Sequence, residues 1–124
     1  MIDDIKEFFD RFVDDFSLFD GAILANHYQA PYLAVSPDGD IWQCSAQSEV
    51  ADYLQSLLDR HSSQGVRSCT CTEIESTPIG KSCALVSVTW SMKGEDNKVI
   101  LSWRESYNLV KTDAGLKIFT SIDH

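Results

Sequence analysis

The sequence has few basic residues. Ten lysines and arginines stand against nineteen aspartates and glutamates, which gives a formal net charge of −9. Affinity for nucleic acid depends on clustered Lys and Arg that displace counterions from phosphates, and an anionic membrane surface needs a similar basic patch. The composition therefore predicts a protein with no nucleic-acid partner and no membrane partner.

Long apolar runs are also missing, and no stretch approaches the length that spans a bilayer. Residues 1–19 carry six acidic residues and no basic start, which is unlike a secretory signal. We therefore expect a cytoplasmic protein whose four cysteines stay reduced. Cys69 and Cys71 share a strand face, but no further Cys or His pair completes a metal site. Buried thiols are expected, with a disulfide to Cys83 as the alternative.

Motifs of several enzyme classes are absent. The chain contains no phosphate-binding glycine loop, no dinucleotide glycine motif, no nucleophile elbow and no H-E-x-x-H. Nucleotide, covalent serine and zinc-protease chemistry are therefore not expected, and no cofactor is predicted. The 124 residues include six Phe, four Tyr and three Trp, enough for one core without disulfide or metal. We expect a single domain over residues 1–124.

The strongest pattern lies in residues 81–124, where apolar and polar residues alternate along three runs. This period of two predicts an antiparallel meander with one apolar face. Glu105 falls on the apolar face, whereas Ser102, Arg104, Ser106 and Asn108 line the opposite one. The apolar positions are Ala84, Val86, Val88, Trp90 and Met92 in the first run, Val99, Leu101, Trp103, Tyr107 and Leu109 in the second, and Leu116, Ile118 and Ile122 in the third.

Helices are predicted before the meander. Phenylalanines recur three or four apart over residues 3–19, which indicates an amphipathic helix. A short second helix runs through Tyr28 until Pro31 ends it, and a third begins at the N-cap Ser45 and ends near Gly65. Residues 32–36 and 41–42 form a short hairpin, residues 66–76 a further strand, and residues 77–80 a turn into the meander. This order predicts an α+β fold in which a curved, mostly antiparallel sheet wraps three helices.

This order of elements resembles the nuclear transport factor 2-like superfamily, which includes SnoaL-like cyclases, ketosteroid isomerase and scytalone dehydratase. The resemblance covers nearly the whole chain. It lies in the second helix running into residues 28–32, the turn at 37–40, and the final hairpin from 107–111 to 116–119. It implies a cystatin-like, cone-shaped α+β fold with a pocket between helices and sheet, and a homodimer formed through the other sheet face. The pocket would then be lined by Phe12, Phe16, Tyr28, Trp42, Trp90, Trp103, Glu105 and Tyr107.

Two residues are candidates for proton transfer, Glu105 and His27. An unpaired carboxylate on an apolar face costs several kcal/mol, so Glu105 must be paired, neutral or in a wet cavity. It could act as a base or ligand anchor with a raised pKa, or pair structurally with Arg67, Lys98 or His27. His27 lies on the apolar side of a short helix. The tyrosine that isomerase-type sites carry on their first helix has no counterpart here.

Three functions follow from these residues. The first is a homodimeric binding domain for a small hydrophobic molecule. The second is a cofactor-independent isomerase, cyclase or dehydratase that uses Glu105 with His27 or Tyr107. The third is a protein-interaction module, which would have a filled interior and an exposed apolar patch on the sheet.

Overall fold

The computed structural model describes residues 2–124, with side chains from Asp4 onward. Three α-helices, one turn of 3₁₀ helix and a six-stranded sheet form an α+β cone, and the fold class predicted from the sequence is confirmed. The elements are α1 (Ile2–Phe16), α2 (Gly21–Leu24), η1 (Ala25–His27), β1 (Tyr28–Val35), β2 (Ile41–Cys44), α3 (Gln47–Ser63), β3 (Ser68–Ile79), β4 (Cys83–Lys93), β5 (Val99–Thr112) and β6 (Gly115–Asp123).

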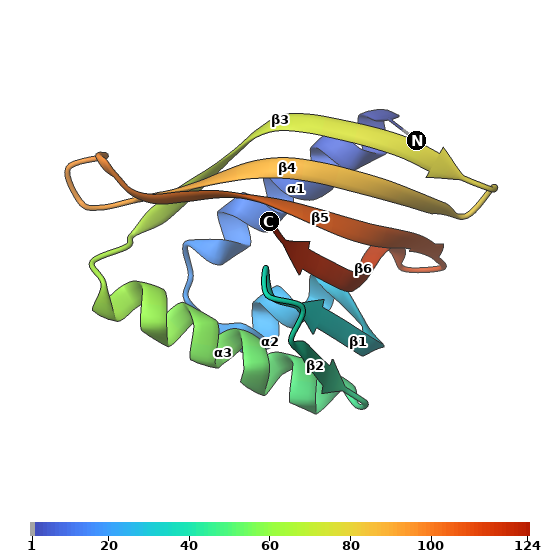
Figure 1. The fold of residues 1–124 in the computed structure, drawn as a ribbon, viewed down its shortest axis with the longest axis horizontal. Coiled ribbons are helices and arrows are strands. Elements are labelled where there is room, and N and C mark those ends of the chain that lie inside the picture. The colour runs from blue at the N-terminus through green and yellow to red at the C-terminus, as the bar shows by residue number, and fades with distance from the viewer. Residues whose placement is uncertain (1) are drawn as a thin grey trace.

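The sheet has the strand order β2-β1-β6-β5-β4-β3. All neighbouring strands are antiparallel except β1 and β6, which run parallel. The long strands β3, β4 and β5 curve over α1, while α3 packs against α2 and β1 (Figure 1). Because the last strand of the meander pairs with the first strand of the chain, the C-terminal end of β6 is brought to the centre of the sheet.

The phenylalanine face of α1 forms one half of the core. Phe9 and Phe12 lie against Trp90 of β4, with ring centroids 6.1 and 5.4 Å apart. All three side chains are buried, as are Val86 and Val88 on the same face of β4. Burying each Phe is worth about 1.5–3 kcal/mol, so this contact fixes α1 on the sheet.

The first helix ends earlier than the sequence predicts. It stops at Phe16, and Phe19 adopts a left-handed backbone with φ of 52°. The carboxylate of Asp20 then caps α2 by accepting from the backbone N–H groups of Ala22 and Ile23, at 2.9 and 3.3 Å. The predicted second helix is also shorter, because Tyr28 already belongs to β1.

Two further boundaries differ from the prediction. The N-cap of α3 is Ala46 rather than Ser45, and the Glu49 carboxylate accepts from the Ala46 N–H at 3.1 Å. A glutamate three residues into a helix can satisfy the cap's backbone in this way. Strand β3 continues to Ile79 instead of turning at Thr77, since ladder pairing with β4 persists through Ile79 and Cys83.

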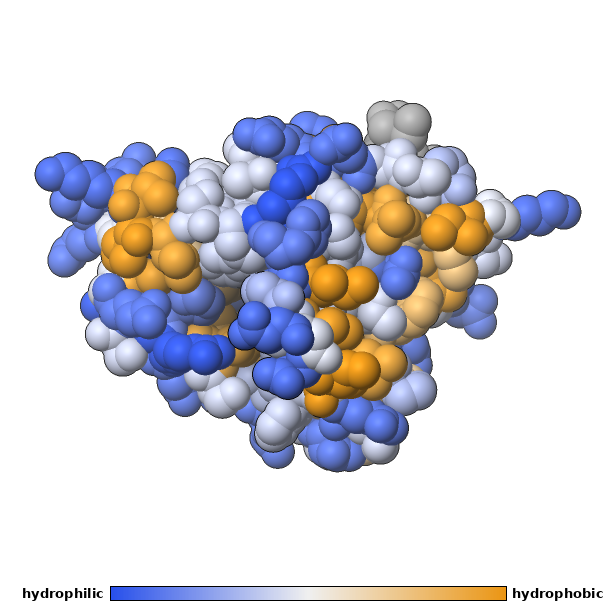
Figure 2. Space-filling model, in the orientation of Figure 1, coloured by the Kyte–Doolittle hydropathy of each residue, from blue (hydrophilic) through white to orange (hydrophobic). Residues whose placement is uncertain are grey.

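Three positions assigned to the apolar face are exposed. Val99 and Leu101 are 57% and 43% exposed at the tip of the β4–β5 hairpin, where apolar side chains gather on the surface (Figure 2). The Ile122 side chain is 39% exposed. The reason is a bulge in β6 between Ile118 and Thr120, which shifts the register of the β5–β6 ladder. One extra residue reverses the alternation of faces. The bulge therefore turns Ser121 inward in place of Ile122.

The four cysteines are free thiols. The disulfide considered above is wrong because of the strand register: Cys69 and Cys71 pair with Met92 and Trp90, at the far end of the hairpin from Cys83. Burial raises the pKa of both the Cys69 and the Cys71 thiols to about 12. Both thiols are therefore protonated at neutral pH and unreactive as nucleophiles.

Candidate functional site

A cavity of about 560 Å³ lies between helices α1 and α3 and the concave face of the sheet. The sequence-predicted pocket residues all lie on its wall, namely Phe12, Phe16, Tyr28, Trp42, Trp90, Trp103, Glu105 and Tyr107. Trp90 is buried at 2% exposure, whereas Trp42 is 61% exposed and stacks on Tyr53 with ring centroids 6.1 Å apart. The interior is therefore not packed solid, and its wall runs from buried to exposed aromatic rings.

Glu105 is the acidic residue that the sequence pattern places inside. It is 9% exposed, and the indole Nε1–H of Trp103 donates to its Oε1 at 2.9 Å. Burial, and after it the nearby Asp123 carboxylate, raise the pKa of Glu105 to about 8. A carboxyl group with this pKa keeps its proton through most of the neutral range, so it can donate a hydrogen bond or exchange a proton.

None of the structural ion pairs considered for Glu105 forms. Arg67 donates to the backbone carbonyls of Ser62 and Val66. The Nζ of Lys98 lies 3.9 Å from Oδ2 of Asp96. The neighbours of Glu105 are instead a carboxyl, a phenol and an indole. The carboxyl group therefore stays uncompensated by any cationic side chain in residues 4–124.

Asp123 reaches the cavity through the bulge in β6. It is the Cα partner of Glu105 across the β5–β6 ladder, and the two side chains hydrogen-bond. A second carboxyl group beside Glu105 disfavours ionisation of Glu105, because like charges repel. Ser121, turned inward by the same bulge, bonds the Tyr32 hydroxyl. Strict alternation could not identify Ser121, since no residue type in β6 marks the bulge.

Tyrosine hydroxyls surround the carboxyl pair. The Trp90 indole donates to the Tyr107 hydroxyl oxygen at 2.8 Å, which leaves the Tyr107 hydrogen for Glu105. Burial raises the pKa of Tyr107, Tyr28 and Tyr32 well above the usual value, with Glu105 adding to the effect. All three phenols therefore remain neutral donors at physiological pH.

His61 of α3 also lines the cavity, although its place in a helix stripe indicates only a structural role. Its ring stacks on Trp103 at 5.9 Å with an interplanar angle of 6°, and lies 6.0 Å from Phe16. Burial, with a smaller effect of Arg60, lowers the pKa of His61. The imidazole is therefore neutral at pH 7, and its buried Nδ1 has no hydrogen-bond partner within residues 4–124.

His27 lies away from this site. Its Nε2 is 2.7 Å from an Asp15 carboxylate oxygen, and its ring packs 5.5 and 5.6 Å from Phe8 and Phe12. It borders a different hollow, on the side of α1 where Lys117 reaches the Asn26 carbonyl. The structure does not bring His27 to Glu105, so a proton-transfer pair of these two residues is not formed.

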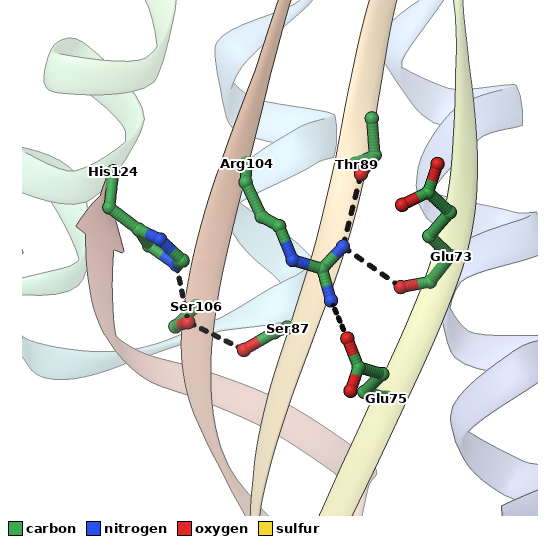
Figure 3. Close-up of polar contacts among 7 residues, drawn as sticks. All are labelled: Glu73, Glu75, Ser87, Thr89, Arg104, Ser106 and His124. Carbon is green, nitrogen blue, oxygen red and sulfur yellow. Dashed lines mark hydrogen bonds and ion pairs between the residues drawn. The ribbon is translucent and has the colours of Figure 1, made fainter.

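The outer face of the sheet carries a polar network (Figure 3). Arg104 donates to the Glu73 carbonyl and to the Thr89 hydroxyl, both at 3.0 Å, and pairs with the Glu75 carboxylate. Ser106 Oγ lies 2.6 Å from Ser87 Oγ and 2.8 Å from His124 Nε2. These side chains point away from the cavity. Pairing of two subunits through this face stays a prediction.

The described part of the chain contains neither a cluster of metal-ligating side chains nor a helix able to span a membrane. Among residues 4–124, no three His, Cys, Asp or Glu side chains gather closely enough to hold a metal ion. None of the described helices is long and apolar enough to cross a bilayer. The polar groups on the cavity wall include the carboxyl group of Glu105, the tyrosine hydroxyls, the indole N–H groups and the His61 imidazole.

The chain belongs to the family described as NTF2-like protein (DUF6841), whose model matches residues 3–124. This match confirms the resemblance to the nuclear transport factor 2-like superfamily that the order of elements indicates. No curated protein matches the chain.

Solved structures with the same fold are numerous and distant in sequence. An NTF-2 like protein of unknown function from Shewanella oneidensis MR-1 is 18% identical with a TM-score of 0.75, covering 98% of this chain and 97% of that one. Aln2 from a Streptomyces species is 11% identical with a TM-score of 0.77, over 98% and 87%. A domain of unknown function with a cystatin-like fold from Nostoc punctiforme is 17% identical with a TM-score of 0.73, over 96% and 73%. At these identities the likeness shows the fold alone.

Proposed function

We propose that this protein binds a small, largely apolar molecule in the cavity between its helices and sheet. The observation that carries the proposal is the cavity itself, whose volume of about 560 Å³ falls within the range typical of ligand pockets. Its wall is built mainly of apolar and aromatic side chains, with polar groups that include Glu105, Asp123 and Ser121. Apolar walls supply affinity, and convergent polar groups orient the ligand.

An interaction module with a filled interior fits the structure less well. Protein cores without a bound ligand normally pack to high density, because each empty cavity lowers the stability of the fold. Here the apolar strand face and the helices leave a volume that several side chains could fill. The open interior favours a ligand inside over a partner on the sheet.

Filling the cavity should abolish binding. Leu57 of α3 lines the wall and is half-buried, so Leu57→Trp adds an indole to the space a ligand would occupy. In a screen of hydrophobic metabolites by thermal shift and tryptophan fluorescence, we expect hits for the native chain, with affinity reduced at least tenfold (~1.4 kcal/mol) in Leu57→Trp. All three tryptophans line the cavity and report on binding.

The matched control is Leu18→Trp, which makes the same change at a side chain 59% exposed outside the cavity. It should bind hits as the native chain does. A screen without hits, or hits that bind both variants equally, would remove the cavity from the proposal.

A second function, cofactor-independent proton transfer, is favoured by the Glu105–Asp123 pair. A carboxyl group with a pKa of about 8 is well matched to accept and return a proton near neutral pH. The hydroxyl of Tyr107 hydrogen-bonds the same carboxyl and could donate to a developing oxyanion. Any such reaction would use Tyr107 as the second group rather than His27.

Proton transfer would be detected as deuterium exchange next to a carbonyl. Cavity ligands that carry a carbonyl are incubated in D₂O, and exchange at the adjacent carbon is followed by NMR. We expect Glu105→Gln to lower the exchange rate by roughly 10²–10⁴-fold, while His27→Gln leaves it unchanged. Equal rates for the native chain and Glu105→Gln would exclude this function without affecting binding.

A further inference from the structure

We propose that the cavity takes an apolar amine, a molecule with a hydrocarbon body and one ammonium group held by the carboxylates of Glu105 and Asp123 and the aromatic rings around them. This inference rests on the proposed small-molecule function and names the class of ligand. It concerns the part of the cavity wall where the buried Glu105 and the half-buried Asp123 are Cα partners across the β5–β6 ladder.

The carboxyl pair lacks a counter-charge. No ion pair joins Glu105 or Asp123 to a Lys, Arg or His side chain within residues 4–124. Arg60, which also lines the cavity, is exposed to solvent. A buried carboxylate is normally paired or hydrogen-bonded, and an ammonium group would supply both a charge and up to three N–H donors.

Aromatic side chains line the same cavity. Besides the exposed Trp42, six tyrosines and tryptophans line the wall, and the charges of Glu105 and Asp123 both act on the hydroxyls of the three tyrosines from β1 and α3. Rings of this kind attract a cation, most strongly where water is excluded. The six are Tyr28, Tyr32, Tyr53, Trp90, Trp103 and Tyr107.

The charge of the site disfavours anions. An anionic ligand would further disfavour ionisation of Glu105, and the net charge of −9 repels anions. A neutral ligand would instead accept a hydrogen bond from protonated Glu105, so the pH dependence of binding separates the two cases. The titratable groups that interact with Glu105 are Asp123, Tyr107, Tyr28, Tyr32, Tyr53 and Cys71. Asp40, Arg60 and His61 also line the cavity.

Binding of an ammonium ion ionises Glu105. The O–H bond of the protonated carboxyl breaks, its proton passes to the buffer, and the carboxylate pairs with the ammonium group. Because the pKa of Glu105 is about 8, amine affinity should rise as pH increases toward that value, by up to about tenfold per pH unit. A neutral hydrogen-bond acceptor should show the opposite slope, losing affinity as Glu105 ionises.

The probes are phenylbutylamine and its neutral analogue phenylbutanol, which share a hydrocarbon body. Isothermal titration calorimetry from about pH 6 to pH 8 gives each affinity, and buffers of different ionisation enthalpy give the protons released. The amine keeps its charge over this range, since alkyl ammonium groups titrate near pH 10. We expect the amine to bind at least about tenfold tighter than the alcohol at pH 8, with release of a proton at pH 7.

Glu105→Gln should remove this preference, because the amide can neither ionise nor pair with the ammonium group. Glu95→Gln makes the same charge change at an exposed site in the β4–β5 turn and should leave it intact. Binding of the alcohol as tight as the amine, or amine affinity that does not rise with pH, would overturn the inference and leave small-molecule binding standing. A screen in which no compound of any charge binds would overturn both.

Discussion

Glu105→Gln should make the protein more stable at pH 8 than the native chain, and the gain should shrink as the pH is lowered. In the native fold, burial, and after it the Asp123 carboxylate, raise the pKa of Glu105 from 4.5 to about 8. Between these values the folded state holds a proton that the unfolded state has lost. Stability from this group is therefore present at low pH and falls as pH rises, by up to about 1.4 kcal/mol per unit. Glutamine carries no such penalty.

Urea denaturation at several pH values measures this difference. The free energy of unfolding of the native chain should fall relative to Glu105→Gln between about pH 5 and pH 8. Asp123→Asn is the informative comparison, because it removes only the second cause of the raised pKa and should leave the larger effect of burial. Parallel pH curves for the native chain and Glu105→Gln would show that the carboxyl titrates normally in the fold.

Gly21→Ala should destabilise the fold by about 3 kcal/mol, or prevent folding, because helix α2 touches α3 at this residue. A methyl group there would lie 2.5 Å from the Ala51 carbonyl oxygen and 2.8 Å from the Gln55 backbone nitrogen. These backbone atoms cannot move aside without displacing α3. The substitution would also disturb the Gln55 side chain, which accepts from the Gly21 N–H at 2.8 Å.

Thermal and urea denaturation of Gly21→Ala test this contact, with Gly94→Ala as the control. At Gly94 the nearest atom to an added methyl group is the flexible end of the Ile100 side chain, at 3.2 Å. Gly94→Ala should therefore change stability by less than about 1 kcal/mol. Similar midpoints for the two variants would mean that α2 and α3 are not in close contact.

The inward position of Glu105 could be predicted from sequence because it depends only on alternation along one strand. Trp103, Glu105 and Tyr107 share a face in any regular β-strand, and β5 is regular through these residues. The fold class followed from the order of helical and strand periods, which is set by burial of apolar faces. These features are local, or follow from local features repeated along the chain.

The partner of Glu105 could not be predicted in the same way. Asp123 and Ser121 enter the cavity only because β6 bulges between Ile118 and Thr120, and a one-residue bulge leaves no signature in residue type here. His27 lies apart from Glu105 because the backbone turns into β1 at Tyr28, a residue that the periodicity assigns to a helix. Both cases depend on contacts distant in sequence.

A buried carboxyl group that keeps its proton at neutral pH inside an open cavity is the feature on which the proposed site depends. The most direct measurement is an NMR titration of the side-chain carboxyl carbons in ¹³C-labelled protein, with the Glu105 resonance assigned by its loss in Glu105→Gln. We expect this resonance to titrate at about pH 8. Titration near the ordinary value of 4.5 would place Glu105 in solvent and contradict the site described above.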